Sequence, residues 1–173
     1  DTALWDLYGR LKEKPVASLI GGGPKKIRVY GSSMRRDITP SNESIRLCKL
    51  RDKLGINAFK FRVGSECGRD KDEWEGRSKE IVKTLSRDLG NKVDKLVDGN
   101  SCFSPESAIE LGKFMQDTGI SHFEEPCPYW EHDQTKVVKE ALEIDVAGGE
   151  QDCDISTWKS TLGKRIVDIA QPD

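Results

Sequence analysis

The stretch "VDKLVDGNSCFSPESAIELGKFMQDTGISHFEEP", residues 93–126, holds one complete strand–helix–strand unit. The runs "VDKLVDGN" and "ISHFEEP" are short and rich in strand-forming residues, and each predicts a strand. Between them, "SPESAIELGKFMQDTG" predicts a helix, because Ser104 precedes a proline at the first helical position and Gly119 stops the pattern. A helix between two strands favours parallel pairing of those strands.

The same unit recurs on both sides of this stretch. Further strands are predicted at 25–33, 56–64, 144–150 and 167–173, and further helices at 39–55, 72–90, 132–142 and 155–163. Six strands therefore alternate with helices, which places the chain in the α/β class with a parallel sheet. Two closures are possible at this point, an open doubly wound sheet or a (β/α)8 barrel. No glycine-rich phosphate turn of the GxGxxG or GxxxxGK[ST] kind follows any predicted strand.

Composition excludes several classes of partner. The 173 residues carry a net charge of −2 with acids and bases interspersed, which gives no basic footprint for nucleic acid and no polybasic patch for a membrane surface. No apolar run approaches the roughly 20 residues of a membrane span, and the opening residues do not read as a signal peptide. Five widely spread cysteines without a CxxC pair favour reduced thiols and a cytoplasmic location.

Three consecutive predicted strands end in a carboxylate. These are Asp98, Glu124 and Glu150, which are 26 residues apart in each case (98 to 124 and 124 to 150). Parallel strands share their C-terminal edge, where ligand sites lie in such folds. Three carboxylates meeting there repel one another unless a cation lies between them, and an all-oxygen site suits Mg²⁺. The sequence therefore predicts a magnesium site at this edge.

Other charged residues are expected at the same edge. In "KFR", Lys60 and Arg62 point to one side of their strand, because side chains alternate with period two. The final "QPD" places Asp173 at the end of the last predicted strand. Glu125 should point away from its neighbour Glu124 and is interpreted as a structural or supporting residue. His122 is interpreted as a packed strand residue and not as a ligand.

A simpler interpretation exists for each acid taken singly. An acid after a strand is often a helix cap or a solvated turn residue. That interpretation is favoured for any one of the three carboxylates and disfavoured for all three together. Lys60 and Arg62 have a similar alternative as surface bases of an edge strand.

The ordered set of motifs resembles a known family. "DTALWDLYGRLKEKPVASLIGG", "KFRVG", "VDGN", "FEEP", "GGEQ" and "IAQPD" are together similar to the enolase superfamily, in its mandelate racemase-like subgroup. The resemblance implies a modified (β/α)7β barrel with a separate capping domain. Residues 1–26 then correspond to the end of the capping-domain segment and a linker, and 27–173 to an incomplete catalytic barrel of about six βα units from a longer protein.

The resemblance also implies roles for individual residues. Asp98, Glu124 and Glu150 match the three Mg²⁺ ligands of the family, and Lys60 matches a lysine that contacts the substrate carboxylate. Arg62 stands where the family has a second lysine that acts as a base, and a guanidinium is a poor general base. Asp173 matches the aspartate of a His–Asp pair whose histidine belongs to a later strand.

These roles predict a Mg²⁺-dependent lyase. The expected reaction removes the proton α to a carboxylate, forms an enediolate and dehydrates an acid sugar, with Asn100 contacting the substrate or a metal-bound water. The alternatives are a racemase or epimerase of the same superfamily, or a noncatalytic metal-binding barrel fragment. The acid sugar is left open, and a homo-oligomer is expected.

Overall fold

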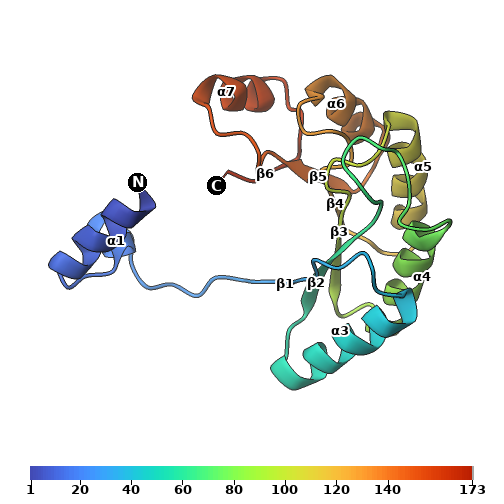
Figure 1. The fold of residues 1–173 in the computed structure, drawn as a ribbon, viewed down its shortest axis with the longest axis horizontal. Coiled ribbons are helices and arrows are strands. Elements are labelled where there is room, and N and C mark those ends of the chain that lie inside the picture. Colours follow the sequence, from blue (N-terminus) through green and yellow to red (C-terminus); the bar gives the residue numbers. More distant parts are fainter. Residues whose placement is uncertain (173) are drawn as a thin grey trace.

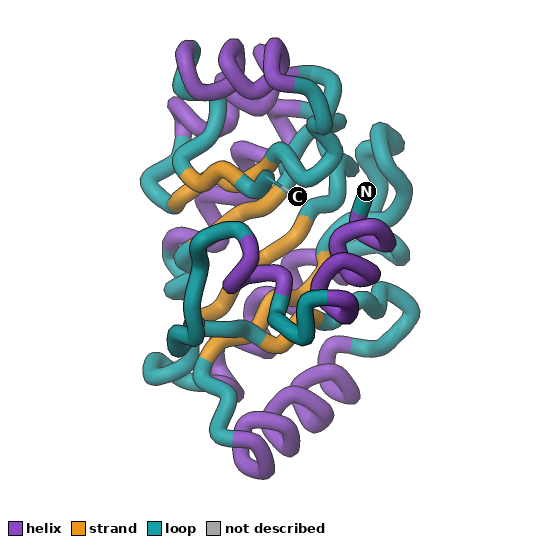
Figure 2. The backbone as a smooth tube through the Cα atoms, turned by 90° about the vertical axis from the view of Figure 1, so that its left-hand side faces the viewer, coloured by secondary structure: helices purple, strands orange, loops and turns teal. Residues whose placement is uncertain are grey.

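Six parallel strands form one sheet in the computed structural model, which describes residues 1–172. The strands follow one another in sequence order, β1-β2-β3-β4-β5-β6, and each pairs in parallel with the next. Their bounds are β1 Gly31–Ser32, β2 Ala58–Arg62, β3 Asp94–Asp98, β4 His122–Glu124, β5 Asp145–Gly148 and β6 Ile169–Ala170. Figure 1 shows the strands as an arc, and Figure 2 looks onto the concave side of that arc.

Five helices connect the strands on the convex side. They are α3 Pro40–Leu54, α4 Arg77–Leu89, α5 Pro105–Gln116, α6 His132–Ala141 and α7 Ile155–Gly163. Figure 1 places all five outside the arc. An open doubly wound sheet carries helices on both faces, so this one-sided cover favours the barrel over the open sheet. The predicted α/β class with a parallel, barrel-like sheet is confirmed.

Local sequence signals set most helix bounds. Thr39 caps α3 by accepting a hydrogen bond from the Asn42 backbone N–H at 3.3 Å, and Gly55 ends that helix in the left-handed region at φ 66°. Ser104 caps α5 in the same way through the Ser107 N–H. The predicted start of the helix at residue 72 was too early: α4 begins at Arg77, because Gly76 precedes it with φ 78°.

Alternate residues of the strands face opposite sides of the sheet. Phe59, Phe61, Val97, Phe123 and Val146 are fully buried and belong to the apolar core. That core also includes the inward side chains of the covering helices, such as those of α4. The intervening residues of β2, β3 and β4 are mostly polar or charged and lie on the concave face. The convex face of the sheet thus packs against the helices, whereas the concave face carries the polar and charged side chains.

The two outermost strands are shorter than predicted. The run 25–33 contributes only Gly31–Ser32, and the run 167–173 only Ile169–Ala170. Each of these strands has a neighbour on one side only within residues 1–172, so fewer backbone groups are held in a ladder. Asp173, predicted to end the last strand, lies outside the described residues.

The N-terminal helices stand apart from the sheet. Helix α1, Thr2–Leu11, packs against the short α2, Val16–Leu19, and an extended segment leads from them to β1 (Figure 1). Leu4, Trp5 and Leu11 of α1 are exposed. This separation agrees with a boundary near residue 26, although the capping-domain assignment stays a prediction. No helix in the described residues is long and apolar enough to cross a membrane.

Candidate active site

Two predicted carboxylates lie side by side at the C-terminal edge of the sheet. Asp98 and Glu124 are the last residues of β3 and β4, and they pair in register with each other. Arg62 ends β2 and pairs with Asp98. Because these positions share one level of a parallel sheet, their side chains emerge on the same face. The sheet register therefore brings together Arg62, Asp98 and Glu124.

Lys60 lies beneath this row and reaches up to it. Its ammonium donates a hydrogen bond to Glu124 Oε1 and lies 3.6 Å from Asp98 Oδ2. The Tyr30 ring centroid is 5.6 Å from the same nitrogen. Burial works to lower the pKa of Lys60, but the bond to Glu124 and the Asp98 charge raise it on balance. Lys60 is therefore a buried, charged group shared by two carboxylates.

The pKa values of Glu124 and Asp98 are shifted in opposite directions by these surroundings. Burial works to raise the pKa of Glu124, but His122 and Lys60 outweigh it and lower the value to about 2. The pKa of Asp98 is raised, first by burial and then by the neighbouring Glu124 charge, although Lys60 and Arg62 oppose the shift. His122 Nε2 lies 3.5 Å from Glu124 Oε2. Burial is thus the main reason that the pKa of Asp98 is raised, although two cations lie beside it.

One oxygen of this pair lacks a hydrogen-bond donor within residues 1–172. Glu124 Oε2 is buried and accepts no hydrogen bond from the described residues, although His122 Nε2 lies 3.5 Å away, and this is costly for a carboxylate oxygen. A divalent cation would satisfy it, and an all-oxygen set of carboxylates is the donor chemistry that Mg²⁺ prefers. Asp98 and Glu124 therefore fit a magnesium ion in donor type.

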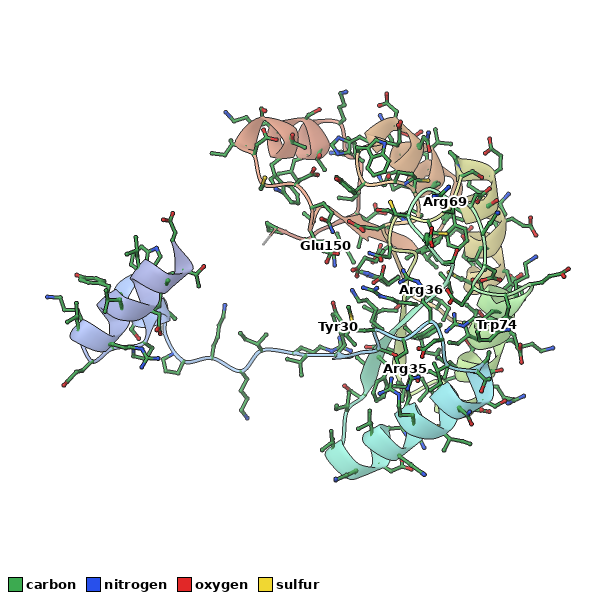
Figure 3. The ribbon with its side chains drawn as sticks, viewed as in Figure 1. Tyr30, Arg35, Arg36, Arg69, Trp74 and Glu150 are labelled. Atoms are coloured by element: carbon green, nitrogen blue, oxygen red, sulfur yellow. The ribbon has the colours of Figure 1, made fainter. Side chains whose placement is uncertain are left out.

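The third predicted ligand comes from the next strand. Glu150 lies two residues beyond β5, half-buried, and Figure 3 shows it on the open side of the arc. Gly149 sets its position, because its φ of 109° favours glycine and a Cβ there would meet the Trp158 ring at 2.4 Å. Within residues 1–172, no three acidic, histidine or cysteine side chains are grouped closely enough to hold a metal ion as they stand. The ligand set Asp98, Glu124 and Glu150 stays a prediction.

The turn after β3 supports the same edge. Asn100 and Ser101 have φ values of 45° and 62°, and Glu125 has 39°. Gly99 lies so close to the Glu125 carbonyl that a Cβ would come within 2.9 Å of it. Such left-handed residues are costly unless their surroundings hold them, and they gather at functional sites. The backbone here is held by hydrogen bonds from Gly99 N–H to the Glu124 carbonyl and from Ser101 N–H to the Glu125 carbonyl, both at 2.8 Å.

Asn100 lies between two guanidinium groups. Its Oδ1 accepts hydrogen bonds from Arg62 at 3.3 Å and from Arg36 at 2.9 Å, while its backbone N–H donates to Asp98 Oδ1 at 2.8 Å. Arg62 Nε is also 3.4 Å from Asp98 Oδ2. The pKa of Arg36 is lowered, first by burial and then by the Arg62 charge. The structure thus brings Lys60, Arg62 and Asn100 to the carboxylates.

Sequence reasoning overlooked Arg36 and interpreted Glu125 as a structural or supporting residue. Arg36 follows β1 at the same edge, and the pair "RR" just beyond a predicted strand was an available signal. Glu125 is buried and accepts a hydrogen bond from Ser101 Oγ at 3.2 Å, while its Oε1 has no hydrogen-bond partner in the described part of the chain. Burial and the Glu150 charge raise the pKa of Glu125 to about 7. Glu125 is therefore a buried neighbour of the site.

Comparison with known proteins assigns the family. Residues 43–173 match the family model described as "Enolase C-terminal domain-like". The chain belongs to this family, and so to the enolase superfamily in its mandelate racemase-like subgroup. The resemblance read from the motifs is confirmed.

Curated relatives of the chain include acid-sugar dehydratases. The arabinonate dehydratase of Saccharolobus solfataricus is 33% identical over 181 residues, which cover 100% of this chain and 45% of that protein. The D-xylonate dehydratase of Haloferax volcanii is 27% identical and is covered over 44% of its length. The chain thus spans about half the length of the curated relatives it matches.

Solved structures share the fold closely. A candidate racemase from Roseobacter denitrificans is 58% identical with a TM-score of 0.95, and the match covers 100% of this chain and 47% of that one. A mandelate racemase/muconate lactonizing protein from Paracoccus denitrificans, solved with magnesium, is 26% identical with a TM-score of 0.84. That match covers 99% of this chain and 46% of the other. The incomplete enolase-type barrel is confirmed.

Proposed function

We propose that this chain belongs to a Mg²⁺-dependent hydro-lyase that dehydrates an acid sugar. The reaction takes a proton from the carbon α to the carboxylate and releases the β-hydroxyl, so that one water leaves in total. The observation that carries the proposal is the buried Lys60 ammonium, bound to Glu124 and near Asp98 at the C-terminal edge of the sheet. The dehydratases among the relatives support the reaction class.

Each residue of the site has a role in this proposal. Asp98, Glu124 and Glu150 would hold Mg²⁺, which would stabilise negative charge as it develops on the substrate carboxylate. Lys60 adds a positive group at the same carboxylate. Arg62 and Asn100 orient the substrate, since a guanidinium donates hydrogen bonds readily and accepts protons poorly. Asp173, which lies outside the described residues, keeps its predicted role as partner of a histidine base.

Racemisation or epimerisation is the second candidate. It is favoured by the 58% identical structure from Roseobacter denitrificans, a candidate racemase. Removal and return of a proton on opposite faces needs a competent base on each face, and Arg62 is a poor one. One-sided proton abstraction followed by loss of hydroxide needs one base and one acid. Dehydration is therefore preferred. A homo-oligomer and a cytoplasmic location stay predictions.

Turnover in D₂O tests the proposal. The full-length protein, supplied with Mg²⁺, is incubated with a library of acid sugars, and keto-acid product and deuterium uptake are measured. We expect product with at least one acid sugar and a loss of about 10³-fold or more in Glu124→Gln, because charge stabilisation at a reacting carboxylate is a large term. The exposed Glu140→Gln on α6 is the matched control.

The outcomes separate the candidates. If recovered substrate contained deuterium but no water had been lost, the racemase would be favoured and the dehydratase rejected. If a protein that binds Mg²⁺ gave no product and no deuterium exchange with any acid sugar, only the noncatalytic alternative would remain. Glu125→Gln should reduce turnover less than Glu124→Gln does.

A further inference from the structure

Two guanidinium groups converge on one neutral oxygen at the rim of the site. Arg62 ends β2, whereas Arg36 comes from the segment between β1 and α3 (Figure 3). Both donate hydrogen bonds to Asn100 Oδ1. An amide oxygen carries no net charge, so it accepts these bonds without offsetting the repulsion between the two cations.

The two arginines also retain unused donors. The Nε atoms of Arg36 and Arg62 are buried and make no hydrogen bond to any of residues 1–172. Arg62 has the Asp98 carboxylate within ion-pair distance, and Arg36 has the charges of Asp98 and Glu73 in its surroundings. A buried donor without an acceptor is unfavourable, and an oxyanion offers several lone pairs to guanidinium groups. The pair therefore has the donors and the charge of an anion site.

The neighbouring arginine shows that this arrangement is specific to Arg36. Arg35 lies on the surface and binds Asp37 through both carboxylate oxygens, at 3.0 and 2.8 Å. Arg36, one residue further, is half-buried and turns toward Asn100 instead. Both side chains come from the same segment, so their different partners follow from the direction in which each one points: Arg35 toward Asp37 and Arg36 toward Asn100.

A third arginine fixes the spacing of the pair. Arg77 is fully buried and stacks on Trp74, with its guanidinium carbon 5.2 Å from the ring centroid. It donates to the Arg62 carbonyl at 3.0 Å and to the Arg35 carbonyl at 3.5 Å. One side chain thus ties the end of β2 to the segment that carries Arg36. Such support is what holds a binding group in place before the ligand arrives.

The anion site lies beyond the Lys60 centre along the strands. Lys60 binds Glu124 at the last residue of β4, whereas Arg36 binds Asn100, two residues past the end of β3. We infer that Arg36 and Arg62 bind a second anionic group of the substrate, so that the preferred substrate is a dianionic sugar acid. A sugar diacid, with a carboxylate at each end, and a sugar acid phosphate ester share this chemistry. The inference rests on the proposed function.

Binding to matched ligands tests the inference in the full-length protein with Mg²⁺. Calorimetry compares a sugar monoacid with the diacid and the terminal phosphate ester of the same configuration, which differ only at the last carbon. We expect the unmodified protein to bind at least one dianion about tenfold or more tightly than the monoacid, because charge-assisted hydrogen bonds are the strong ones. The phosphate ester and the diacid are titrated in separate experiments, so that the preferred dianion is identified.

Substitution assigns the preference to Arg36. Arg36→Gln should remove that tenfold advantage of the dianion over the monoacid, whereas the adjacent Arg35→Gln should leave the advantage unchanged. Equal weakening of monoacid and dianion in Arg36→Gln, or equal affinities in the unmodified protein, would overturn the inference.

The two proposals fail separately. Dehydration of monoacids with no preference for dianions would leave the proposed function standing and remove the second anion site. Arg36-dependent binding of a dianion, without turnover of any acid sugar, would remove the dehydratase and leave the anion site in place.

Discussion

The outer and inner faces of the sheet are built from alternate residues of the same strands, yet they differ in almost every property. On β4, Phe123 is fully buried against the core, while His122 and Glu124 beside it face the concave side. The outer face is closed by five helices. The inner face includes a groove of about 280 Å³ lined by residues such as Leu96, His122 and Ile169. Stability should therefore depend on one face and chemistry on the other.

The largest expected effect on stability is on the outer face. Phe123→Ala in the full-length protein should lower the free energy of unfolding by about 3–5 kcal/mol, because it removes a fully buried ring and leaves a cavity. Chemical denaturation measures the change. The exposed Val137→Ala on α6 is the control and should change stability by roughly 0.5 kcal/mol or less. Equal losses in the two variants would contradict the assignment of the core.

Lys60→Met tests whether charge holds the inner face together. Without metal, it should lower the free energy of unfolding by about 3 kcal/mol, because Asp98 and Glu124 lose their shared cation while buried. Added Mg²⁺ should recover part of that loss by binding the freed carboxylates. Lys79→Met removes an exposed ion pair with Glu110 and should cost less than about 1 kcal/mol. If the free energy of unfolding of Lys60→Met were the same with and without Mg²⁺, the proposed metal position would be contradicted.

A smaller effect is expected where the backbone places Glu150. Gly149→Ala should cost about 1–3 kcal/mol, because the new Cβ meets Trp158 at a φ that favours glycine. It should also weaken Mg²⁺ binding by shifting Glu150. Gly163→Ala, at the end of α7, should be nearly neutral, because the added Cβ would meet no described atom within 4 Å beyond its own helix backbone and chain neighbours. Unchanged Mg²⁺ affinity in Gly149→Ala would remove Glu150 from the ligand set.

The smallest effect is expected at the start of α7 and depends on pH. Asp154 caps this helix, accepting from the Thr157 N–H at 2.9 Å and from the hydroxyls of Ser156 and Thr157. These bonds lower the pKa of Asp154. A lowered pKa means that the cap stabilises the fold above the ordinary carboxyl pKa, near 3.8, and loses this contribution as pH falls below it.

Denaturation at two pH values measures this contribution. Asp154→Ala should lower stability at pH 7, and the difference from the unmodified protein should shrink at pH 3. A difference that stays constant between the two pH values would show that the cap acts without its charge.

The period-two pattern of the strands explains which parts of the site could be predicted. It placed Lys60 and Arg62 on one face, and the equal spacing of the acids placed Asp98 and Glu124 at one edge, where the structure puts them. The caps Thr39 and Ser104 could also be predicted, because a helix cap depends only on residues close to it in sequence.

Arg36 could not be predicted in this way. Its position depends on the path of the segment after β1, which the buried Arg77 holds through contacts far apart in sequence. The two outer strands were predicted but too long, because the length of a strand depends on which neighbours pair with it. Local patterns thus predict the row of carboxylates, whereas tertiary contacts decide what surrounds it.

Magnesium binding tests the central claim most directly. Calorimetric titration of the full-length protein compares the unmodified form with Asp98→Asn, Glu124→Gln, Glu150→Gln and the control Glu140→Gln. We predict one Mg²⁺ site in the unmodified form and the control. Each ligand variant should bind at least about 100-fold more weakly, since even outer partners of metal ligands cost about 10–100-fold. Unchanged Mg²⁺ affinity in all three ligand variants would contradict the account.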